Sequence, residues 1–171
     1  YKLEDYPSHA EGMTFPNPDK VYYSEDIFVG YRGFEKRGIK PLFAFGHGLS
    51  YTEFEYSDIR LSKECIKDGE MLQASVTITN RGKRAGKEVV QLYIADKESS
   101  VARPAKELKG FEKIALEPGE SKVVTFDITP EALSFYDDRG KGEWRTESGE
   151  FEVLIGSASD DIRLSKRFTL E

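Results

Sequence analysis

The sequence predicts an all-β chain: an antiparallel β-sandwich of two sheets, preceded by an irregular N-terminal extension. From Phe54 onward, apolar and polar residues alternate with a period of two, the pattern of strands that bury one face. Turn-forming residues separate these alternating runs, and a helical period is nearly absent. The composition supplies a core, since 38% of the 171 residues are hydrophobic and 12% are aromatic. Short strands at regular spacing are typical of a sandwich.

Six runs of residues carry the strand pattern. In the clearest run, Leu72, Ala74 and Val76 alternate with polar residues, so that one face of the strand is apolar. The predicted strands are 54–61, 72–79, 90–94, 124–128, 151–155 and 162–170. We expect the first strand at the edge of a sheet and the last strand to close the sandwich.

The connections between these strands contain recognisable turn residues. Asn80-Arg81-Gly82 ends the second strand. Pro118-Gly119 suits the central positions of a type II turn, because proline fixes φ and glycine accepts the positive φ that follows. One helical turn is expected at 130–133, with Pro130 at its first position and Thr129 as its N-cap.

Residues 1–53, which we call the strap, are predicted to contain no helix. Prolines and glycines interrupt this segment so often that only short strands or turns are expected. The strap nevertheless holds more aromatic residues than a solvated linker does. They include Phe15, Tyr22, Tyr23, Phe28, Tyr31, Phe34, Phe43 and Phe45. The strap therefore either wraps back over the sandwich, residues 54–171, or lies against partner domains.

The charge of the chain argues against a nucleic-acid partner. The formal net charge is −6, whereas phosphate binding needs a clustered excess of Lys and Arg. Lys106, Lys109 and Lys113 alternate with Glu107 and Glu112. This segment is therefore predicted to be a solvated face of mixed charge.

The sequence predicts neither a membrane span nor a disulfide framework. No run approaches the roughly twenty apolar residues that cross a bilayer, and no charged start precedes an apolar core. Cys65 is the single cysteine, which excludes an internal disulfide and a cysteine zinc site and slightly favours the cytoplasm. No metal or cofactor is expected. The chain opens at Tyr1 without Met, which we interpret as a point inside a longer polypeptide, so that a signal region would lie outside it.

Several motifs resemble one enzyme family. EDIFVGYR at 25–32 and PLFAFGHGLSYT at 41–52 resemble the segment that leads into the C-terminal domain of glycoside hydrolase family 3 enzymes, typically β-glucosidases. Further blocks follow in the order of that family's fibronectin type III-like domain, an immunoglobulin-like sandwich. These blocks are NRG at 80–82, GKEVVQLY at 86–93, RP at 103–104, KELKGF at 106–111, LEPGE at 116–120 and the segment 149–156. Asp26 and Ala44 depart from the resemblance, since the family often has Gly and Pro there.

The resemblance implies a non-catalytic role for this chain. Retaining glycoside hydrolysis needs two carboxyl groups about 5 Å apart, and in this family both come from upstream domains. The chain is therefore expected to brace the catalytic domains of its own polypeptide, with no catalytic residue of its own. The parent is expected to hydrolyse terminal β-glucosidic bonds, with xylosidase and arabinosidase specificity left open. The neighbouring acids Glu25-Asp26, Asp137-Asp138 and Asp160-Asp161 cannot supply this pair of carboxyl groups, because adjacent residues of a strand point to opposite faces and do not converge on one bond. They are predicted to be solvated loop acids.

The loop around Gly46 and Gly48 is the predicted contact with those upstream domains, since two glycines allow a sharp turn among bulky anchors. The expected contact residues are Tyr31, Arg32, Phe43, Phe45, His47 and Tyr51. His47 is assigned either to packing and hydrogen bonding in the loop or to a neighbouring domain, and not to a metal, because only His9 could join it. Arg32 has two interpretations: a carboxylate partner in another domain, or one in its own sandwich.

Trp144 also has two interpretations. A single indole beside Glu143 and Arg145 is predicted to pack in or near the core. The alternative is carbohydrate binding, because the C–H faces of sugars stack on flat aromatic rings. A carbohydrate-binding module is therefore the second function considered, although the sequence has no row of several such aromatics. A freestanding adhesion-type sandwich is the third, and the strap argues against it because a free module would expose the strap's aromatics.

Overall fold

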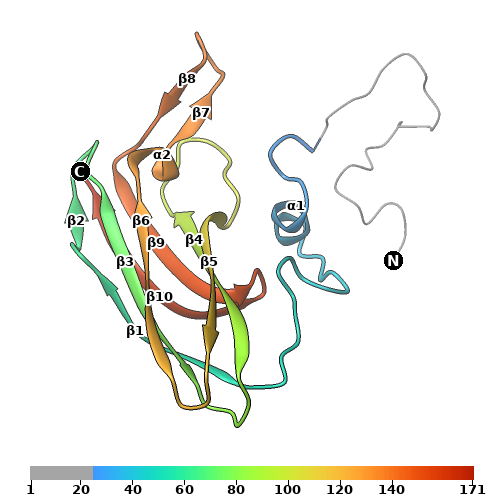
Figure 1. The fold of residues 1–171 in the computed structure, drawn as a ribbon. Coiled ribbons are helices and arrows are strands. Elements are labelled where there is room, and N and C mark those ends of the chain that lie inside the picture. The colour runs from blue at the N-terminus through green and yellow to red at the C-terminus, as the bar shows by residue number, and fades with distance from the viewer. Residues whose placement is uncertain (1–24) are drawn as a thin grey trace, which may run out of the picture.

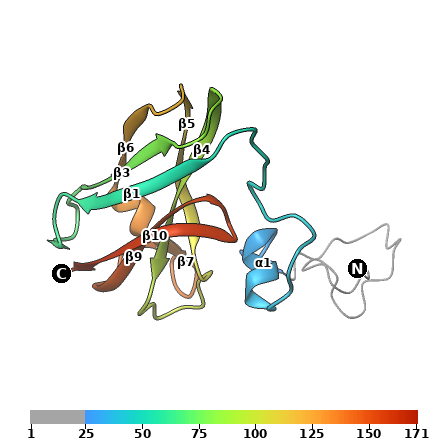
Figure 2. The ribbon, with the colours of Figure 1, turned by 90° about the horizontal axis from the view of Figure 1, so that it is seen from below.

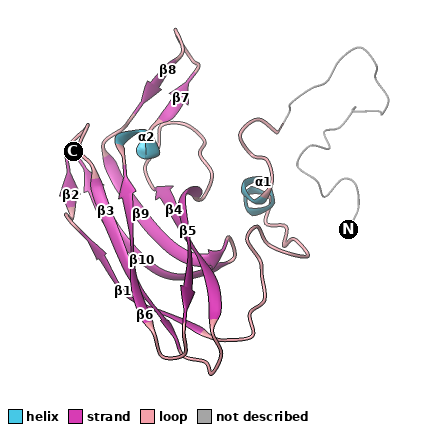
Figure 3. Cartoon of the chain, in the orientation of Figure 1, coloured by secondary structure: helices cyan, strands magenta, loops and turns pink. Residues whose placement is uncertain are grey.

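A computed structural model describes residues 25–171 as a β-sandwich with residues 25–53 of the strap along one side (Figure 1). Its strands are β1 (Phe54–Leu61), β2 (Cys65–Ile66), β3 (Leu72–Asn80), β4 (Gly86–Asp96), β5 (Glu107–Leu116), β6 (Ser121–Ile128), β7 (Phe135–Asp137), β8 (Glu143–Arg145), β9 (Gly149–Ala158) and β10 (Asp161–Leu170). The helices are α1 (Tyr31–Lys36) and α2 (Pro130–Leu133). Strands dominate the chain (Figure 3), so the all-β prediction is confirmed.

The strands form two sheets and a small hairpin. The smaller sheet has the order β1-β3-β6, the larger sheet has the order β2-β10-β9-β4-β5, and β7 pairs with β8. Neighbouring strands are antiparallel except β2 and β10, whose parallel pairing departs from the expectation. Apolar residues meet across the ladders: Val76 lies opposite Val124, and Leu92 lies opposite Ile155. The predicted two-sheet sandwich is confirmed.

All six predicted strands occur, and β2, β5, β7 and β8 occur in addition. β5 did not stand out in the sequence because its first half carries Gly110 among charged residues. Only its second half shows the expected alternation, where Ile114 and Leu116 enter the core. The first half of this strand carries charged and small residues because α1 of the strap contacts it.

The strand β4 is buried on both of its faces. Val90, Leu92 and Ile94 point into the core between the sheets. The alternate residues Gln91 and Tyr93 point to the outer face of the larger sheet, yet they are buried too. Outward positions of an antiparallel sheet are exposed where that face is solvated. A further segment must therefore cover this face, and that segment is the strap.

The predicted turns are present, with one difference at α2. Gly119 has a φ of +78°, and the Glu120 N–H donates to the Glu117 carbonyl at 3.0 Å, as in a type II turn. The helical turn α2 follows Thr129, whose carbonyl accepts a hydrogen bond from the Ala132 N–H at 2.9 Å. The Thr129 side chain makes no capping hydrogen bond, so the backbone alone closes this turn.

The prediction that the strap contains no helix is wrong, because Tyr31–Lys36 forms α1. Gly30 and Gly38, with φ of +59° and +64°, stand just outside this helix and delimit it instead of preventing it. Seen from below, α1 lies beside the sandwich, and the chain then runs along the sandwich to β1 (Figure 2). Predictions for residues 1–24, including Phe15, Tyr22, Tyr23 and His9, lie outside the described residues.

Candidate interdomain contact surface

Tyr31 fixes the inner side of the strap to the larger sheet. Its ring meets the ring of Tyr93 on β4 edge to face, with 5.9 Å between the centroids. The Tyr31 hydroxyl accepts a hydrogen bond of 2.8 Å from the backbone N–H of Leu108 on β5. Burial raises the pKa of Tyr31 above its ordinary value, so the hydroxyl stays protonated at neutral pH. Tyr31 is therefore a contact within this chain.

Charged pairs hold the same helix to β5. Glu35 of α1 pairs with Lys106, and Arg32 Nη1 lies 3.8 Å from Glu107 Oε1. Arg32 thus has its partner in its own sandwich. Lys109 also approaches Glu107, at 3.7 Å, and burial lowers the pKa of Lys109. The predicted solvated face is wrong for Lys106 and Lys109, because both lysines are half-buried in an ion-pair network with Glu35 of α1 and Glu107.

The glycine-rich loop also rests on the sandwich. The Phe45 ring stacks on Tyr31 with 5.4 Å between centroids, and the Phe45 carbonyl accepts a hydrogen bond of 2.9 Å from the Ser159 N–H. Gly46 has a φ of +84°, and a Cβ at this position would lie 2.2 Å from Gln91 Nε2. Both constraints favour glycine. The loop backbone is therefore closely packed against β4.

His47 lies on the exposed side of this loop. Its backbone N–H donates to the Ala44 carbonyl at 3.0 Å, and its ring lies 5.4 Å from the ring of Phe43. Among residues 25–171, no group of three or more His, Cys, Asp and Glu side chains is placed to hold a metal. The contacts of His47 are thus a packed ring and a local turn, with the imidazole open to solvent.

The outer side of the strap carries much of the exposed apolar surface. Leu49 and Tyr51 are 95% and 93% exposed, and Phe43 is 69% exposed. Seven of the thirteen exposed large hydrophobic residues in the described part of the chain belong to the strap: Ile27, Val29, Leu42, Phe43, Phe45, Leu49 and Tyr51. Single exposed apolar residues are ordinary, but a concentration of this kind is typical of an interface.

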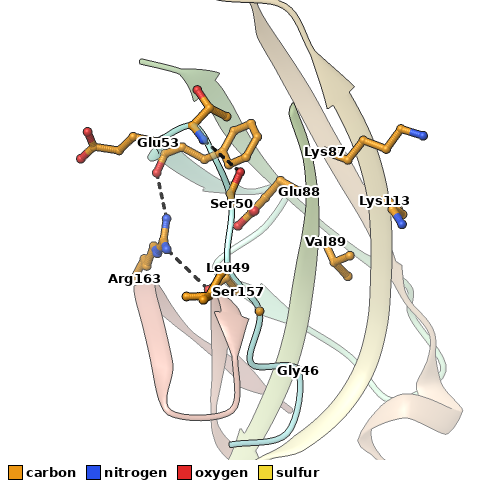
Figure 4. Close-up of a pocket in the computed structure, with 13 residues that line it drawn as sticks. Gly46, Leu49, Ser50, Glu53, Lys87, Glu88, Val89, Lys113, Ser157 and Arg163 are labelled. Atoms are coloured by element: carbon orange, nitrogen blue, oxygen red, sulfur yellow. Dashed lines mark hydrogen bonds between the residues drawn. The ribbon is translucent and has the colours of Figure 1, made fainter. Parts of the chain in front are cut away.

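A cavity of about 550 Å³ lies where the strap joins the sandwich (Figure 4). Six strap residues between Gly46 and Glu53 border it on one side, and residues of β1, β4, β5, β9 and β10 complete its lining. Arg163 of β10 donates a hydrogen bond to the Phe54 carbonyl at 2.8 Å and another to the Asp161 carboxylate at 2.8 Å. Arg163 thereby ties the start of β1, where the strap ends, to the larger sheet. Glu88 points from β4 toward the strap in this cavity (Figure 4).

The carboxyl of Glu88 provides a pH-dependent prediction. Its Oε1 accepts a hydrogen bond of 2.7 Å from the Tyr56 hydroxyl, yet burial raises the pKa of Glu88 above its ordinary value of 4.5. Ionisation of Glu88 is thus harder in the folded chain, so its contribution to stability falls as pH rises from 4.5 through the raised pKa.

We expect Glu88→Gln, which keeps an acceptor for Tyr56, to stabilise the chain at neutral pH. Below the ordinary glutamate pKa the variant and the unaltered chain should have equal stability, because the carboxyl is protonated in both folded and unfolded states. Urea denaturation at a series of pH values measures the difference. A difference that did not grow with pH would show that the burial of Glu88 is not the cause.

Trp144 lies on the surface, so the prediction that it packs in or near the core is wrong. It is 70% exposed and meets Tyr136, its partner across the β7–β8 hairpin, at 5.7 Å between ring centroids. The two rings share the outward face of the hairpin. The opposite face is the buried one, and it carries Phe135 and Asp137. The hairpin is too short for its alternation to show in the sequence which face turns inward.

The predicted solvation of the acid pairs is correct for some members only. Asp26, Asp138 and Asp160 are exposed. Asp137, in contrast, is buried. It pairs with Arg139 and Arg145, and the hydrogen bond from Arg139 is the main cause that lowers the pKa of Asp137. The hairpin is too short for the sequence to show this burial, just as it was too short to show the exposure of Trp144 on the paired strand β8. In the described part of the chain, no helix is long and apolar enough to cross a membrane.

The residues that receive the strap were not predicted from the sequence. They are Gln91 and Tyr93 on β4, Lys106 and Leu108 at β5, and Ser159 after β9. A signal was available for two of them. The run from Val89 to Ala95 is almost continuously apolar, which is typical of a strand buried on both faces.

Comparison with known proteins supports the fold. The fibronectin type III-like domain family matches residues 88–159. The solved structure of beta-glucosidase 3B from Thermotoga neapolitana in complex with α-D-glucose aligns with a TM-score of 0.84 at 44% identity. This alignment covers 97% of the present chain and 22% of that protein. The fibronectin type III-like form of the sandwich is thereby confirmed.

Two curated relatives agree with this match. The chain is 52% identical over 166 residues to thermostable beta-glucosidase B of Acetivibrio thermocellus, covering 96% of this chain and 22% of that protein. It is 48% identical over 164 residues to a beta-glucosidase of Bacteroides ovatus, covering 95% of this chain and 22% of that protein. The chain therefore spans about a fifth of the length of these curated relatives.

Proposed function

Because this chain carries a fibronectin type III-like domain and corresponds to the C-terminal region of glycoside hydrolase family 3 β-glucosidases, we propose that it braces the catalytic domains of its own polypeptide. The relatives are several times longer than the chain, so the greater part of such an enzyme lies outside it. In this proposal the sandwich, residues 54–171, is the rigid element. The strap, residues 1–53, is the segment that contacts the other domains.

One observation carries the proposal: the strap has two sides of different character. The inner side is held to the sandwich by Tyr31, Glu35 and Gly46. The outer side presents apolar residues, of which Leu49 and Tyr51 are almost fully exposed. A segment that only covered the sheet would turn such residues inward. The exposed apolar side therefore supports an occupant, and the lengths of the relatives favour the other domains of such an enzyme as that occupant.

The proposed parent activity is hydrolysis of terminal β-glucosidic bonds. The curated relatives are named as beta-glucosidases, which supports this activity over the xylosidase and arabinosidase alternatives. The catalytic acid and nucleophile would belong to the upstream domains. Of the predicted contact residues, Phe43, His47 and Tyr51 face outward and remain the proposed contacts with other domains. Tyr31, Arg32 and Phe45 hold the strap to its own sandwich.

We expect the chain alone to be inactive. With 4-nitrophenyl β-D-glucoside as substrate, the release of 4-nitrophenol should match that of a buffer blank, because both reacting carboxyl groups would be missing. The protein should be purified from a host that lacks β-glucosidases. Turnover above the blank that copurifies with the chain would place a catalytic centre in it.

Docking is tested by Tyr51→Ala and Leu49→Ala in two contexts. The first context is the chain alone, and the second is a chimera in which the chain replaces the corresponding C-terminal region of the Acetivibrio thermocellus relative. We expect an unchanged melting temperature in the chain alone. In the chimera, each variant should lower stability by about 1.5–3 kcal/mol, the value of burying one large apolar side chain.

The matched control is Phe111→Ala, since Phe111 is 70% exposed on β5 and lies outside the strap. It should leave the melting temperature unchanged in both contexts. Equal effects of Tyr51→Ala in the chain and in the chimera would show that the residue packs on its own sandwich. If Tyr51→Ala and Leu49→Ala had no effect in either context, the outer side of the strap would not be part of the interface.

A further inference from the structure

The β7–β8 hairpin presents two aromatic rings to solvent on a fixed base. Tyr136 and Trp144 form a cross-strand pair, and their rings meet at 72°, nearly at a right angle. Both are exposed, with Trp144 at 70%. The hairpin projects from the end of the sandwich, as Figure 1 shows. The two rings therefore form an open corner and not a flat row.

Charged contacts beneath the rings hold the hairpin in place. On its inward face, Asp137 accepts hydrogen bonds from Arg139 Nε at 2.8 Å and from Arg145 Nη1 at 2.9 Å. These contacts join β7, the turn and β8. Arg103, itself buried in an ion-pair cluster, lies over the Phe135 ring at 5.7 Å. The position of the rings is thus set before any ligand arrives, which lowers the cost of binding.

The turn of the hairpin also fixes the hydroxyl of Tyr136. Gly142 has a φ of +76°, and a Cβ at this position would lie 2.3 Å from the Tyr136 hydroxyl oxygen. Only a glycine lets the backbone approach the phenol so closely. The hydroxyl end of the Tyr136 side chain therefore packs against the turn.

A cavity of about 460 Å³ adjoins the ring pair. Trp144, Tyr136 and Phe28 supply aromatic walls, while Asp26 and Asp138 supply exposed carboxylates. Arginine and lysine side chains line it as well, so both signs of charge are present. The volume lies within the usual range for small-molecule sites of about 300–1,000 Å³.

The geometry points to a binding site for a neutral sugar at this corner, with a pyranose face stacked on Trp144. The C–H face of a pyranose is apolar and flat enough for an indole, while its hydroxyl groups can donate to Asp138 and Asp26. Charges of both signs favour a neutral ligand over an acidic or basic peptide. A corner accommodates one sugar ring, so we assign it to the terminal residue of an oligosaccharide. This role goes beyond docking and rests on residues other than Leu49 and Tyr51.

The single tryptophan of the chain makes the proposal directly measurable. Cellobiose, titrated into the full 171-residue chain, should change the emission of Trp144 saturably and reduce its quenching by acrylamide. Tyr136→Ala keeps the reporter, and we expect it to weaken binding about tenfold through loss of one wall of the corner. Isothermal titration calorimetry extends the measurement to Trp144→Ala, for which binding should be lost, and to Trp144→Phe, which should retain part of it.

Phe111→Ala is the matched control, because Phe111 has the same 70% exposure and does not line this cavity. It should bind cellobiose as the unaltered chain does. The proposal is overturned if cellobiose at millimolar concentrations leaves Trp144 emission unchanged, or if Tyr136→Ala and Phe111→Ala bind equally well. A different result would assign the hairpin to domain docking instead. In that case cellobiose does not bind, and Trp144→Ala lowers stability only in the chimera.

Discussion

Replacing Arg103 with methionine is expected to destabilise the chain by about 3–5 kcal/mol, the usual cost of removing one partner from a buried ion pair. The Arg103 side chain is only 6% exposed. Its Nη1 lies 3.1 Å from Asp96 Oδ2 and donates to the Leu133 carbonyl at 3.0 Å, and its Nη2 pairs with Glu107. The substitution keeps most of the side-chain volume but removes the cation that pairs with Asp96 and the donor to the Leu133 carbonyl, and it leaves Glu107 with only the longer contacts to Arg32 and Lys109. Urea denaturation measures the loss.

An exposed ion pair provides the control for Arg103. Arg81 pairs with Glu55 at 2.5 Å on the surface, where both side chains are substantially exposed. Arg81→Met should therefore cost at most about 1 kcal/mol. If Arg103→Met cost no more than Arg81→Met, the cluster around Arg103 would have to be solvated in solution, and it could not fix α2 and β5 to β4.

Asn80→Leu is expected to have the second-largest effect, about 3 kcal/mol, because several buried polar groups lose their partner at once. The Asn80 side chain is fully buried at the end of β3. Its Oδ1 accepts from Thr52 Oγ1 at 2.6 Å and from the Gly82 N–H at 3.1 Å. Its Nδ2 donates to the carbonyls of Arg84 at 2.8 Å and Leu116 at 3.0 Å. Thermal or urea unfolding of the variant measures the effect.

Two further variants separate these contacts. Thr52→Val removes a single donor to Asn80 and should cost about 1 kcal/mol. Asn80→Asp keeps the acceptor but turns an oxygen toward the carbonyls of Arg84 and Leu116, so it should destabilise more than Thr52→Val does. An Asn80→Leu variant as stable as Thr52→Val would mean that water replaces the lost hydrogen bonds.

The sandwich could be predicted because its signal is local. Residues such as Leu72, Ala74 and Val76 alternate within one strand, and the core then follows from the pairing of apolar faces. The strand β5 lacked that signal, since its first half is shielded by α1, a segment more than seventy residues away in the chain. Long-range cover of this kind leaves no period in the sequence.

The contact surface was predicted as a set of residues but not as a structure with two sides. The aromatic content of the strap indicated packing, yet no local pattern shows that Tyr31 turns inward while Tyr51 turns outward. The same limit applies to Trp144. Which side of a three-residue strand faces solvent depends on how the hairpin is anchored, and that anchor is the pairing of Asp137 with Arg139 and Arg145.

The burial of β4 on both faces has a mechanical consequence. A pull on the strap would reach β4, an interior strand of the larger sheet, through the Tyr31–Tyr93 contact, and the edge strand β5 through the hydrogen bond between Leu108 and Tyr31. The load would act along packed side chains and would then spread through ladders on either side, to β5 and to β9. A central strand resists peeling better than an edge strand, because backbone hydrogen bonds hold it from both sides. The strap is thus attached where the sheet can transmit force from one neighbour to the next without opening.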